Sequence, residues 1–502
     1  EAAGGFELLR GLSPYGLVRN HVPYPPILLR TGFGRAERFP EVHAWKMAAR
    51  LEEAVRPARS VLLDRAPSEG PSPRAPGEVL LERMADAYAF LFDRLGVGYS
   101  LVDRGPWSGG VTTRSAVVKA RLSRDGMRAR LLVSRTPRLN DPLFFGPALS
   151  TGLGHNLVSF ELPGLVPDTQ YHYALEVDGR LDWPSRGEFR TFPEGPASFK
   201  VAFASCAKTA STLDVFDRIR ENRPLFFMNT GDFHYLNISS NNIELFRGGY
   251  DYVLSSPEQS DLYRHIPFVY MWDDHDYGPN DSDKSFVLKD SSLKIFKGMW
   301  PNTYPEGEQF HGNYFNFRYY DAEFFMTDDR FFRDPEGDST GAFLGETQLV
   351  WLKNKLLMSD AAFKFIAVGT QILNDNHFGE SYAEYKKERN DLLDFISKNN
   401  IKGVVFLTGD KHYSELSKRD WNGYPMYDFT CSPLTSPPLP RRLLGAYNNS
   451  YRVPDSDYGR KNFGRINMSG TKGSRSLKIE IYSRTGRQKR SFVLNENDLS
   501  RK

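Results

Sequence analysis

Two stretches of the sequence share one pattern, and this pattern restricts the possible folds more than any other feature. Residues 404–413 read VVFLTGDKHY and residues 224–235 read PLFFMNTGDFHY, so each is an apolar run followed by Thr-Gly-Asp and then by histidine and tyrosine. A short apolar run that ends in turn residues is typical of a fully buried strand. Open α/β sheets bind their ligands at the carboxyl ends of such strands. We therefore expect these two strand ends to form two edges of one site.

Strand and helix patterns alternate from residue 199 to the end of the chain. Strands are expected at 199–205, 225–230, 265–272, 323–327, 363–368 and 404–407, and helices at 211–222, 345–358 and 382–399. Residues 437–475 are expected to form a long loop, and 476–482 with 488–494 a closing hairpin. The alternation predicts an α/β domain over residues 199–502, with two packed sheets and helices outside them.

The part of the chain before residue 199 has a different composition. Before Lys200 the only lysines are Lys46 and Lys119, and the change coincides with the linker-like segment 193–198. Residues 105–193 contain short alternating segments separated by turn residues, which is the spacing of a β-sandwich. These segments are 116–122, 128–134, 156–162 and 171–177. The later ones resemble strands of a fibronectin type III module, and we assign this region no chemistry.

Residues 1–104 form a further region. Apolar residues recur at helical spacing in 41–59 and 78–95, and the segment 66–76 between them is rich in proline, glycine and serine. We expect a helical and irregular N-terminal region, with a partly disordered leader as the alternative. The chain starts at Glu1 without a signal-peptide pattern.

The totals restrict the domain count and the partners. A chain of 502 residues is too long for a single core, so we expect two or three domains. Its net charge of +3 is nearly neutral for this length and indicates no specific nucleic-acid binding. No run approaches the roughly 18 apolar residues of a membrane span, so no transmembrane segment is expected. The two cysteines, Cys206 and Cys431, each follow a strand-like run and are poor evidence for a disulfide framework. The oligomeric state stays open.

Polar side chains collect at the ends of four expected strands. They are Cys206 after the first; Asp232, His234 and Tyr235 after the second; Asp273, Asp274, His275 and Asp276, with Asn280 beyond, after the third; and Asp410 and His412 after the last. Parallel strands place these ends at one edge, so the side chains can converge. A thiolate, a phenolate, carboxylates and imidazoles together suit a trivalent or borderline metal ion, whereas carboxylate and amide oxygens suit a harder divalent ion. A pair of metal ions suits in-line attack on phosphorus.

Each of these motifs also has a purely structural explanation. Gly-Asp at a strand end is usually a turn, and Asp-Asp-His-Asp is typical of a helix N-terminus. Cys206 alone is more readily a small buried hydrophobe, and Tyr235 alone a core residue. Four such strand ends occur in order, however, and three of the ten histidines fall in these short loops. The set as a whole therefore favours a metal site.

The same motifs resemble those of the PhoD-like alkaline phosphatase and phosphodiesterase family, within the calcineurin-like metallophosphoesterase superfamily. The resemblance rests on 203–206, 231–235, 272–276 with Asn280, 324–334 and 409–412, and it extends over residues 105–494. It implies a four-layer α/β sandwich, with two mixed β-sheets flanked by helices, after an all-β fibronectin III/Ig-like domain. It also implies Fe³⁺ and Ca²⁺ as cofactors and a secreted enzyme in an extracellular or periplasmic location.

The resemblance also implies roles for single residues. Cys206, Asp232, Tyr235 and His412 correspond to the iron ligands, with Asp232 as the bridge, and Asn280 and Asp410 to ligands on the calcium side. Asp274 and His275 are expected to act in catalysis, as proton-transfer or ligand-supporting groups. Leu236 and Asn237 follow Tyr235 where the family has a later arginine, so the phosphate clamp departs from the pattern. Arg330, Lys208 and His234 are the candidates for binding the substrate phosphate.

The function that follows is metal-dependent hydrolysis of a small-molecule phosphate ester, as a phosphomonoesterase, a phosphodiesterase or both. A hydroxide or oxide held by the metals is expected to attack phosphorus in line. The alternative on the same scaffold is a dizinc or iron–zinc phosphodiesterase or phospholipase, with Zn²⁺ or Mn²⁺ as the metal. A non-catalytic surface binding module is less favoured, because it predicts missing ligands and every matched position is filled.

Overall fold

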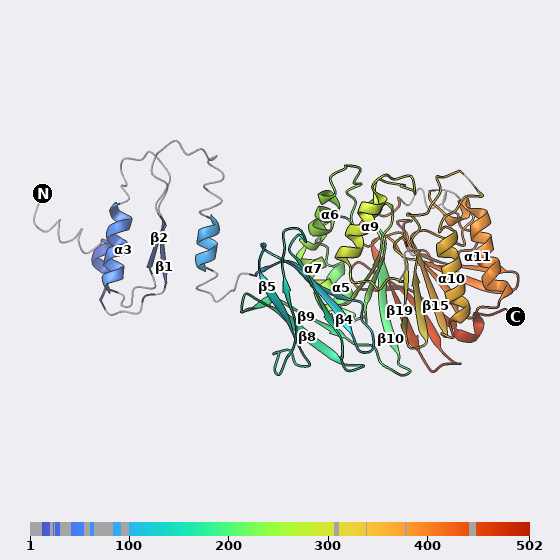
Figure 1. Ribbon diagram of the computed structural model, residues 1–502, viewed down its shortest axis with the longest axis horizontal. Coiled ribbons are helices and arrows are strands. Elements are labelled where there is room, and N and C mark those ends of the chain that lie inside the picture. Colours follow the sequence, from blue (N-terminus) through green and yellow to red (C-terminus); the bar gives the residue numbers. More distant parts are fainter. Residues whose placement is uncertain are drawn as a thin grey trace, which may run out of the picture. The chain divides into compact units, whose positions relative to one another are not determined.

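The structure is a computed structural model. It describes residues 13–20, 24, 26–30, 42–54, 61–64, 84–91, 100–305, 311–337, 339–376, 379–440 and 448–501. The chain divides into two compact units, Glu1–Tyr99 and Ser100–Lys502, and each is considered by itself (Figure 1). Within the described ranges, no helix combines the length and the apolar character that crossing a bilayer requires.

The first unit contains short helices and a small parallel sheet. Its helices are α2 (Pro14–Leu17), α3 (Val42–Ala54) and a helical segment at 84–91. Its strands, β1 (Ile27–Arg30) and β2 (Val61–Asp64), pair in parallel. We expected helices here but not the strand pair, since a four-residue strand is too short to show a clear period of two. The expected linker at 66–76 lies outside the described residues.

The second unit begins with a β-sandwich. One sheet has the order β3 (Val102–Gly109), β4 (Ala116–Leu122), β7 (Leu157–Leu162), and the other the order β6 (Leu143–Leu149), β5 (Arg128–Ser134), β8 (Gln170–Val177), β9 (Arg180–Arg190). Every second residue of β4 is buried, as expected of a strand with one face on a core. The four alternating segments of the sequence coincide with β4, β5, β7 and β8, and three further strands complete the sandwich.

Two six-stranded mixed sheets follow. Sheet I has the order β12 (Phe268–Met271), β11 (Phe227–Thr230), β10 (Phe199–Ala204), β19 (Asn462–Ser469), β20 (Ser476–Ser483), β21 (Gln488–Asn495). Sheet II has the order β13 (Phe315–Tyr319), β14 (Ala322–Met326), β15 (Phe363–Val368), β16 (Val404–Thr408), β18 (Tyr424–Thr430), β17 (Glu415–Trp421). β10 to β12 run parallel, and so do β14, β15, β16 and β18.

The two sheets pack face to face. The ring centroid of Phe203 in sheet I lies 4.9 Å from that of Phe429 in sheet II, and Phe226 lies 5.3 Å from Phe324. The next residue of β14, Phe325, points to the opposite side, into a second core under α10 (Glu346–Met358) and α11 (Lys386–Lys398). The strands are thus buried on both faces, which explains the continuous apolar runs of the sequence.

The helices α5 (Val215–Glu221), α6 (Glu244–Leu254), α7 (Pro257–His265) and α9 (Lys289–Met299) lie beside sheet I (Figure 1). Tyr263 of α7 contacts Phe268 of sheet I, with ring centroids 4.5 Å apart. We expected a strand over 265–272, but β12 begins only at Phe268. The reason is that α7 extends to His265, and the backbone N–H of Ile266 closes its last turn by donating to the carbonyl of Leu262.

β19 corrects the expectation of a long loop at 437–475. This strand lies in the middle of sheet I, where it pairs antiparallel with β10 and β20. Its Gly464 faces Phe203 so closely that a Cβ at this position would stand 2.6 Å from the phenyl ring. Glycine and asparagine are depleted in strands, so their presence makes this segment resemble a loop in the sequence. Its residues Phe463, Ile466 and Met468 are nevertheless buried.

The sandwich is attached to the α/β part through helix ends. Trp107 Nε1 donates to the carbonyl of Met299 (3.1 Å), and Lys119 Nζ donates to the carbonyl of Gly298 (2.6 Å). The Tyr173 hydroxyl donates to the carbonyl of Arg264 (2.8 Å). Carbonyls at the C-terminal end of a helix lack partners within the helix. These donors therefore form hydrogen bonds with carbonyls that the helix itself does not satisfy.

Lys119 allows a pH-dependent test of this attachment. Burial lowers the pKa of Lys119 from 10.5 to about 8, so below pH 8 the folded protein carries the cost of a buried charge. Between pH 8 and 10.5 the folded protein has released this proton and the unfolded chain has not, so the stability that this site contributes rises with pH. Between pH 7.5 and pH 10, we expect the free energy of unfolding of the wild type to rise by about 1–3 kcal/mol relative to that of Lys119→Met.

Urea unfolding of the two proteins at a series of pH values measures this gain. Lys489→Met, which removes an exposed lysine, is the control and should follow the wild type at every pH. A difference between the wild type and Lys119→Met that stays constant over the range would contradict the assignment.

Candidate metal centre

Strands of both sheets end at the same place. β10 and β11 of sheet I lead to Cys206 and Asp232, and β16 of sheet II leads to Asp410 and His412. The backbone N–H of Cys206 donates to the carbonyl of Gly231 (3.1 Å). The Cys206 thiol lies 3.7 Å from the carbonyl oxygen of Asp410. The loops that follow the strands therefore meet where the two sheets face each other.

Four side chains meet at the centre: Cys206, Asp232, Tyr235 and His412, here called the four-residue cluster. Asp232 Oδ2 accepts hydrogen bonds from the Tyr235 hydroxyl (2.9 Å) and from the Cys206 thiol (3.5 Å). The Tyr235 hydroxyl also lies 3.1 Å from His412 Nε2. Ligand atoms of Cys206, Asp232 and His412 are all within 4.8 Å of one another. The structure thus brings together the four residues that the resemblance assigns to iron.

The backbone around this cluster is strained. The φ angle is 61° at Cys206, 58° at Asp232, 62° at Asp410 and 55° at His412. This is the left-handed region, which residues other than glycine adopt only rarely, at a cost of about 1–2 kcal/mol each. Such strain collects at functional sites, where the position of a side chain matters more than local stability.

Burial favours the protonated forms of the acidic groups of the cluster when no cation is present. Burial, with the nearby charge of Asp410, raises the pKa of Cys206 to about 12. Burial and then neighbouring acidic groups raise the pKa values of Asp232 and Tyr235 well above their usual ranges. Asp232 Oδ1 is buried and has no hydrogen-bond partner among the described residues. A metal ion would replace these protons and give this oxygen a partner, so the donor set fits a bound cation.

A second group of ligand atoms adjoins Asp232 on the side of β12. β12 leads into the short helix α8 (Asp274–Tyr277), which Asp273 caps by accepting from the backbone N–H of Asp274. Ligand atoms of Asp232, Asp274 and His275 lie within 4.8 Å of one another. Asp232 is therefore shared between two donor groups, as a carboxylate that bridges two metal ions would be.

His275 is fixed in place by two contacts. Its ring packs against that of Tyr235, with centroids 4.2 Å apart, and its Nδ1 is hydrogen-bonded to Oδ1 of Asn237. Its Nε2 lies 4.0 Å from Asp274 Oδ2. We did not predict this role of Asn237; the available signal was an asparagine in a tight loop, since Asn237 has a φ of 50° and asparagine tolerates this region better than most residues.

The two residues assigned to the calcium side differ in position. Asp410 Oδ2 accepts from Thr370 Oγ1 (3.2 Å) and lies 3.2 Å from Lys411 Nζ, directly beside the Cys206 loop. Asn280 is exposed, and its amide donates to Asp281. The structure thus brings Asp410 to the site and does not place Asn280 against it.

Two of the three candidates for binding phosphate are fully buried. His234 is fully buried against Tyr250 and Gly249, and neither ring nitrogen has a hydrogen-bond partner among the described residues. Burial lowers its pKa to about 3, so the ring is neutral. Arg330 is also fully buried, and it donates to Asp273 (2.6 Å) and Glu380 (2.7 Å). Sequence shows the type of a side chain and not its direction, so the burial of these two residues was not predicted. Lys208 is exposed and stays a prediction.

Arg330 instead supplies the counter-charge of a buried ionic network. Carboxylate oxygens of Asp273, Asp274 and Glu380 lie within 4.8 Å of one another, and the Arg330 guanidinium contacts all three. Arg333 lies 2.7 Å from Glu380. Burial opposes ionisation of Glu380, but these two arginines outweigh it and hold the pKa of Glu380 well below its usual range. The network fixes the loop that carries Asp274.

Comparison with known proteins agrees with this geometry. The sequence model of the PhoD-like phosphatase matches residues 201–478, more than half of the chain. The chain belongs to the PhoD-like phosphatase family. Alkaline phosphatase D of Bacillus subtilis (strain 168) is 24% identical over 322 residues, which cover 52% of this chain and 54% of that protein. The chain therefore spans about half the length of this curated relative.

Solved structures resemble this PhoD-like phosphatase in fold. The structure of PhoD superimposes with a TM-score of 0.66 at 19% identity, over 79% of this chain and 92% of that one. The purple acid phosphatase PPD1 from yellow lupin (Lupinus luteus) seeds gives a TM-score of 0.56 at 13% identity, over 78% of this chain and 74% of that one. At these identities the likeness shows a shared mixed α/β fold with several sheets and helices.

Glu380→Gln tests the buried network. The substitution keeps the shape of the side chain but leaves Arg330 and Arg333 without their shared carboxylate, and an uncompensated buried charge costs about 3–5 kcal/mol. We expect the free energy of unfolding in urea to fall by this amount. Glu384→Gln is the matched control: no ion pair of Glu384 lies within the described residues, and burial raises its pKa to about 7, so this variant should keep wild-type stability. Equal stability of the two variants would refute the network's role.

Proposed function

We propose that this PhoD-like phosphatase hydrolyses small phosphate esters at a metal centre organised around Asp232. The observation that carries the proposal is the buried meeting of a thiol, a phenol, a carboxyl and an imidazole, in which one oxygen of Asp232 has no partner among the described residues. Burying such groups without a cation costs stability and adds no apolar contact. The family match and the name of the Bacillus subtilis relative support phosphoester hydrolysis as the reaction.

The donor types support one ferric ion and one calcium ion. Cys206, Tyr235, His412 and Asp232 would hold the ferric ion, since a thiolate, a phenolate and an imidazole suit iron. Asp232, Asp274 and Asp410 offer only oxygen and would hold calcium. Asn280 is not included, because its exposed amide is bonded to Asp281. The thiol and phenol favour iron over zinc at the first position, and the oxygen-only set favours calcium at the second. When bound, the metal ions supply positive charge that stabilises the phosphate oxygens and acidifies the attacking water.

His275 is the group placed to move a proton. Its Nδ1 is engaged by Asn237 Oδ1, so Nδ1 carries the hydrogen in the neutral ring and Nε2 is free to accept one. Burial lowers the pKa of His275, and the charge of Asp274 opposes this. We assign to Nε2 the uptake of a proton from the attacking water and its return to the leaving-group oxygen, with Asp274 stabilising the charged ring.

One exposed side chain beside the centre is a candidate for binding the substrate. Lys208 follows Cys206 by two residues and is exposed, so we propose it as a contact of the substrate phosphate. A monoester and a diester both fit this assignment. The extracellular or periplasmic location expected from the resemblance remains a prediction.

Asp232→Ala tests the reaction. The purified protein is expected to contain iron and calcium by elemental analysis and to hydrolyse p-nitrophenyl phosphate, bis-p-nitrophenyl phosphate or both. Removing the shared carboxylate is expected to lower the metal content and to reduce kcat/KM roughly 100-fold or more. Asp217→Ala, a half-buried residue of α5 that pairs with Arg220, is the control and should retain both. Full hydrolysis by metal-depleted Asp232→Ala would rule out the proposed centre.

Tyr235→Phe tests the identity of the first metal. A phenolate bound to Fe³⁺ produces a visible charge-transfer band, so the wild type is expected to absorb in the visible range and Tyr235→Phe to lose that band. Tyr413→Phe is the matched control, since Tyr413 is a buried tyrosine whose hydroxyl lies 3.4 Å from Gln371 Oε1. A colourless wild-type protein that contains zinc and hydrolyses phosphate esters would favour the dizinc alternative.

A further inference from the structure

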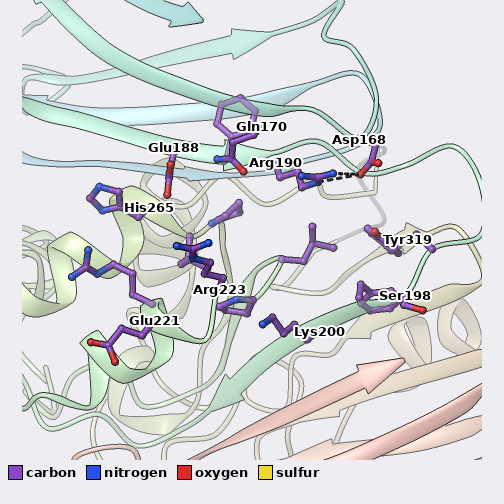
Figure 2. A pocket seen from close by; sticks show the side chains of 18 residues that line it. Asp168, Gln170, Glu188, Arg190, Ser198, Lys200, Glu221, Arg223, His265 and Tyr319 are labelled. Atoms are coloured by element: carbon purple, nitrogen blue, oxygen red, sulfur yellow. Dashed lines mark hydrogen bonds and ion pairs between the residues drawn. The ribbon is translucent and has the colours of Figure 1, made fainter. Parts of the chain in front are cut away.

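A cavity of about 720 Å³ lies at the opposite end of β10 from the metal centre (Figure 2). The sandwich contributes Gln170, Glu188 and Arg190 to its wall, and the α/β part contributes Lys200 and Arg223. Lys200 is the second residue of β10, whereas Cys206 follows the end of this strand. At about 3.3 Å per residue, the two positions lie roughly 20 Å apart, so the cavity is separate from the metal centre.

Most of the charged side chains in this cavity are neutralised by a neighbour. The ion pairs are Arg190–Asp168 (3.0 Å), Arg220–Asp261 (3.1 Å) and Glu221–Arg218 (2.5 Å). Glu188 lies 3.3 Å from His172, which neutralises it only when this histidine is protonated. Lys200 and Arg223 differ: among the described residues, no carboxylate lies within 4.0 Å of either. The cavity therefore has two cations in its wall that form no ion pair within the described residues.

These two cations lie close enough to repel each other. Burial lowers the pKa of Lys200, and the charges of Arg465 and then of Arg223 lower it further. Figure 2 shows Lys200 and Arg223 in the lower wall, across the cavity from Glu188 and Gln170. An anion held between Lys200 and Arg223 would remove the repulsion and form charge-assisted hydrogen bonds with both.

Apolar and aromatic groups complete the wall. The rings of Phe199 and Tyr319 have centroids 4.3 Å apart, and Leu225 and Ile266 also line the cavity. Ligand sites favour such junctions between domains, with apolar walls and a few polar groups. The volume is within the range of cavities that hold small organic ligands, so there is room for more than a bare anion.

We propose that this cavity is a second anion site, which binds a phosphate group between Lys200 and Arg223. A phosphate dianion balances both cations, whereas a carboxylate balances only one, and its oxygens accept from an ammonium and a guanidinium together. The phosphate group comes either from inorganic phosphate or from an organic phosphate whose carbon part lies on Phe199 and Tyr319. The proposal goes beyond the hydrolysis proposed above and does not rest on it.

Phosphate binding to the metal-loaded full-length protein tests the site. Inorganic phosphate is titrated while hydrogen–deuterium exchange is followed at 197–200 and 220–225, which line the cavity, and at 230–236, which belongs to the metal centre. We expect phosphate to protect the cavity segments, and Lys200→Met/Arg223→Gln to weaken this protection at least about tenfold in phosphate concentration. Lys489→Met/Arg487→Gln removes the same charge from two exposed residues, one in β21 and one directly before it. This variant should behave as the wild type.

The outcomes separate this proposal from the hydrolytic one. Cavity protection that is the same in both double variants, or absent from the wild type, overturns the anion site. If Lys200→Met/Arg223→Gln keeps the protection at 230–236 but loses that of the cavity segments, the metal centre is intact. The lost phosphate binding then belongs to the cavity. If the metal centre does not bind phosphate, 230–236 stays unprotected while the cavity segments still respond.

Phenylphosphonate distinguishes the two sources of the phosphate group, because it carries a carbon part and resists hydrolysis. Tighter protection of the cavity by phenylphosphonate than by inorganic phosphate supports an organic phosphate packed on Phe199 and Tyr319. Equal or tighter protection by inorganic phosphate supports the free ion. Failure of both compounds to protect the cavity overturns the proposal.

Discussion

The rest of the site depends on one carboxyl group, that of Asp232. One of its oxygens accepts from Tyr235 and Cys206, and the other is buried without a partner among the described residues. This arrangement is unfavourable for the protein alone, because a buried polar atom without a hydrogen bond costs about 1–3 kcal/mol. A cation shared through Asp232 with Asp274 would convert this cost into binding energy. The geometry of the centre is thus better suited to binding a cation than to stabilising the fold.

The fold supplies the rigidity that such a centre needs. Parallel strands of two sheets, buried on both faces, deliver their ends to one place, and four residues there adopt left-handed backbone conformations. A second layer of charge supports the loops: Arg330 neutralises Asp273 and Glu380, and Lys411 connects the backbone of Glu380 with Asp410. Because these pairs are buried, removing one member strongly destabilises the protein. Replacing a whole pair by apolar residues costs far less stability than removing one member.

Sequence alone predicted that the polar strand ends converge, but not what surrounds them. The four-residue cluster was predictable because each ligand follows a continuous apolar run, and such runs are visible without any long-range information. The inward direction of Arg330 and His234 was not, since it depends on Glu380 and Gly249, which are distant in sequence. β19 was missed because its glycine, required for contact with Phe203, resembles a loop signal. The cavity around Lys200 also depends on two domains meeting, which no single segment reveals.

The central claim is that Asp232 joins a sulfur- and phenol-containing metal site to an oxygen-only one. Anomalous diffraction from crystals of the purified protein, recorded on both sides of the iron absorption edge, tests it most directly. We expect an iron peak within bonding distance of Cys206 Sγ, Tyr235 Oη and His412 Nε2, and a second, non-iron metal peak on the other side of Asp232. Strong density for a metal elsewhere, or a centre with no iron signal in active protein, would contradict it.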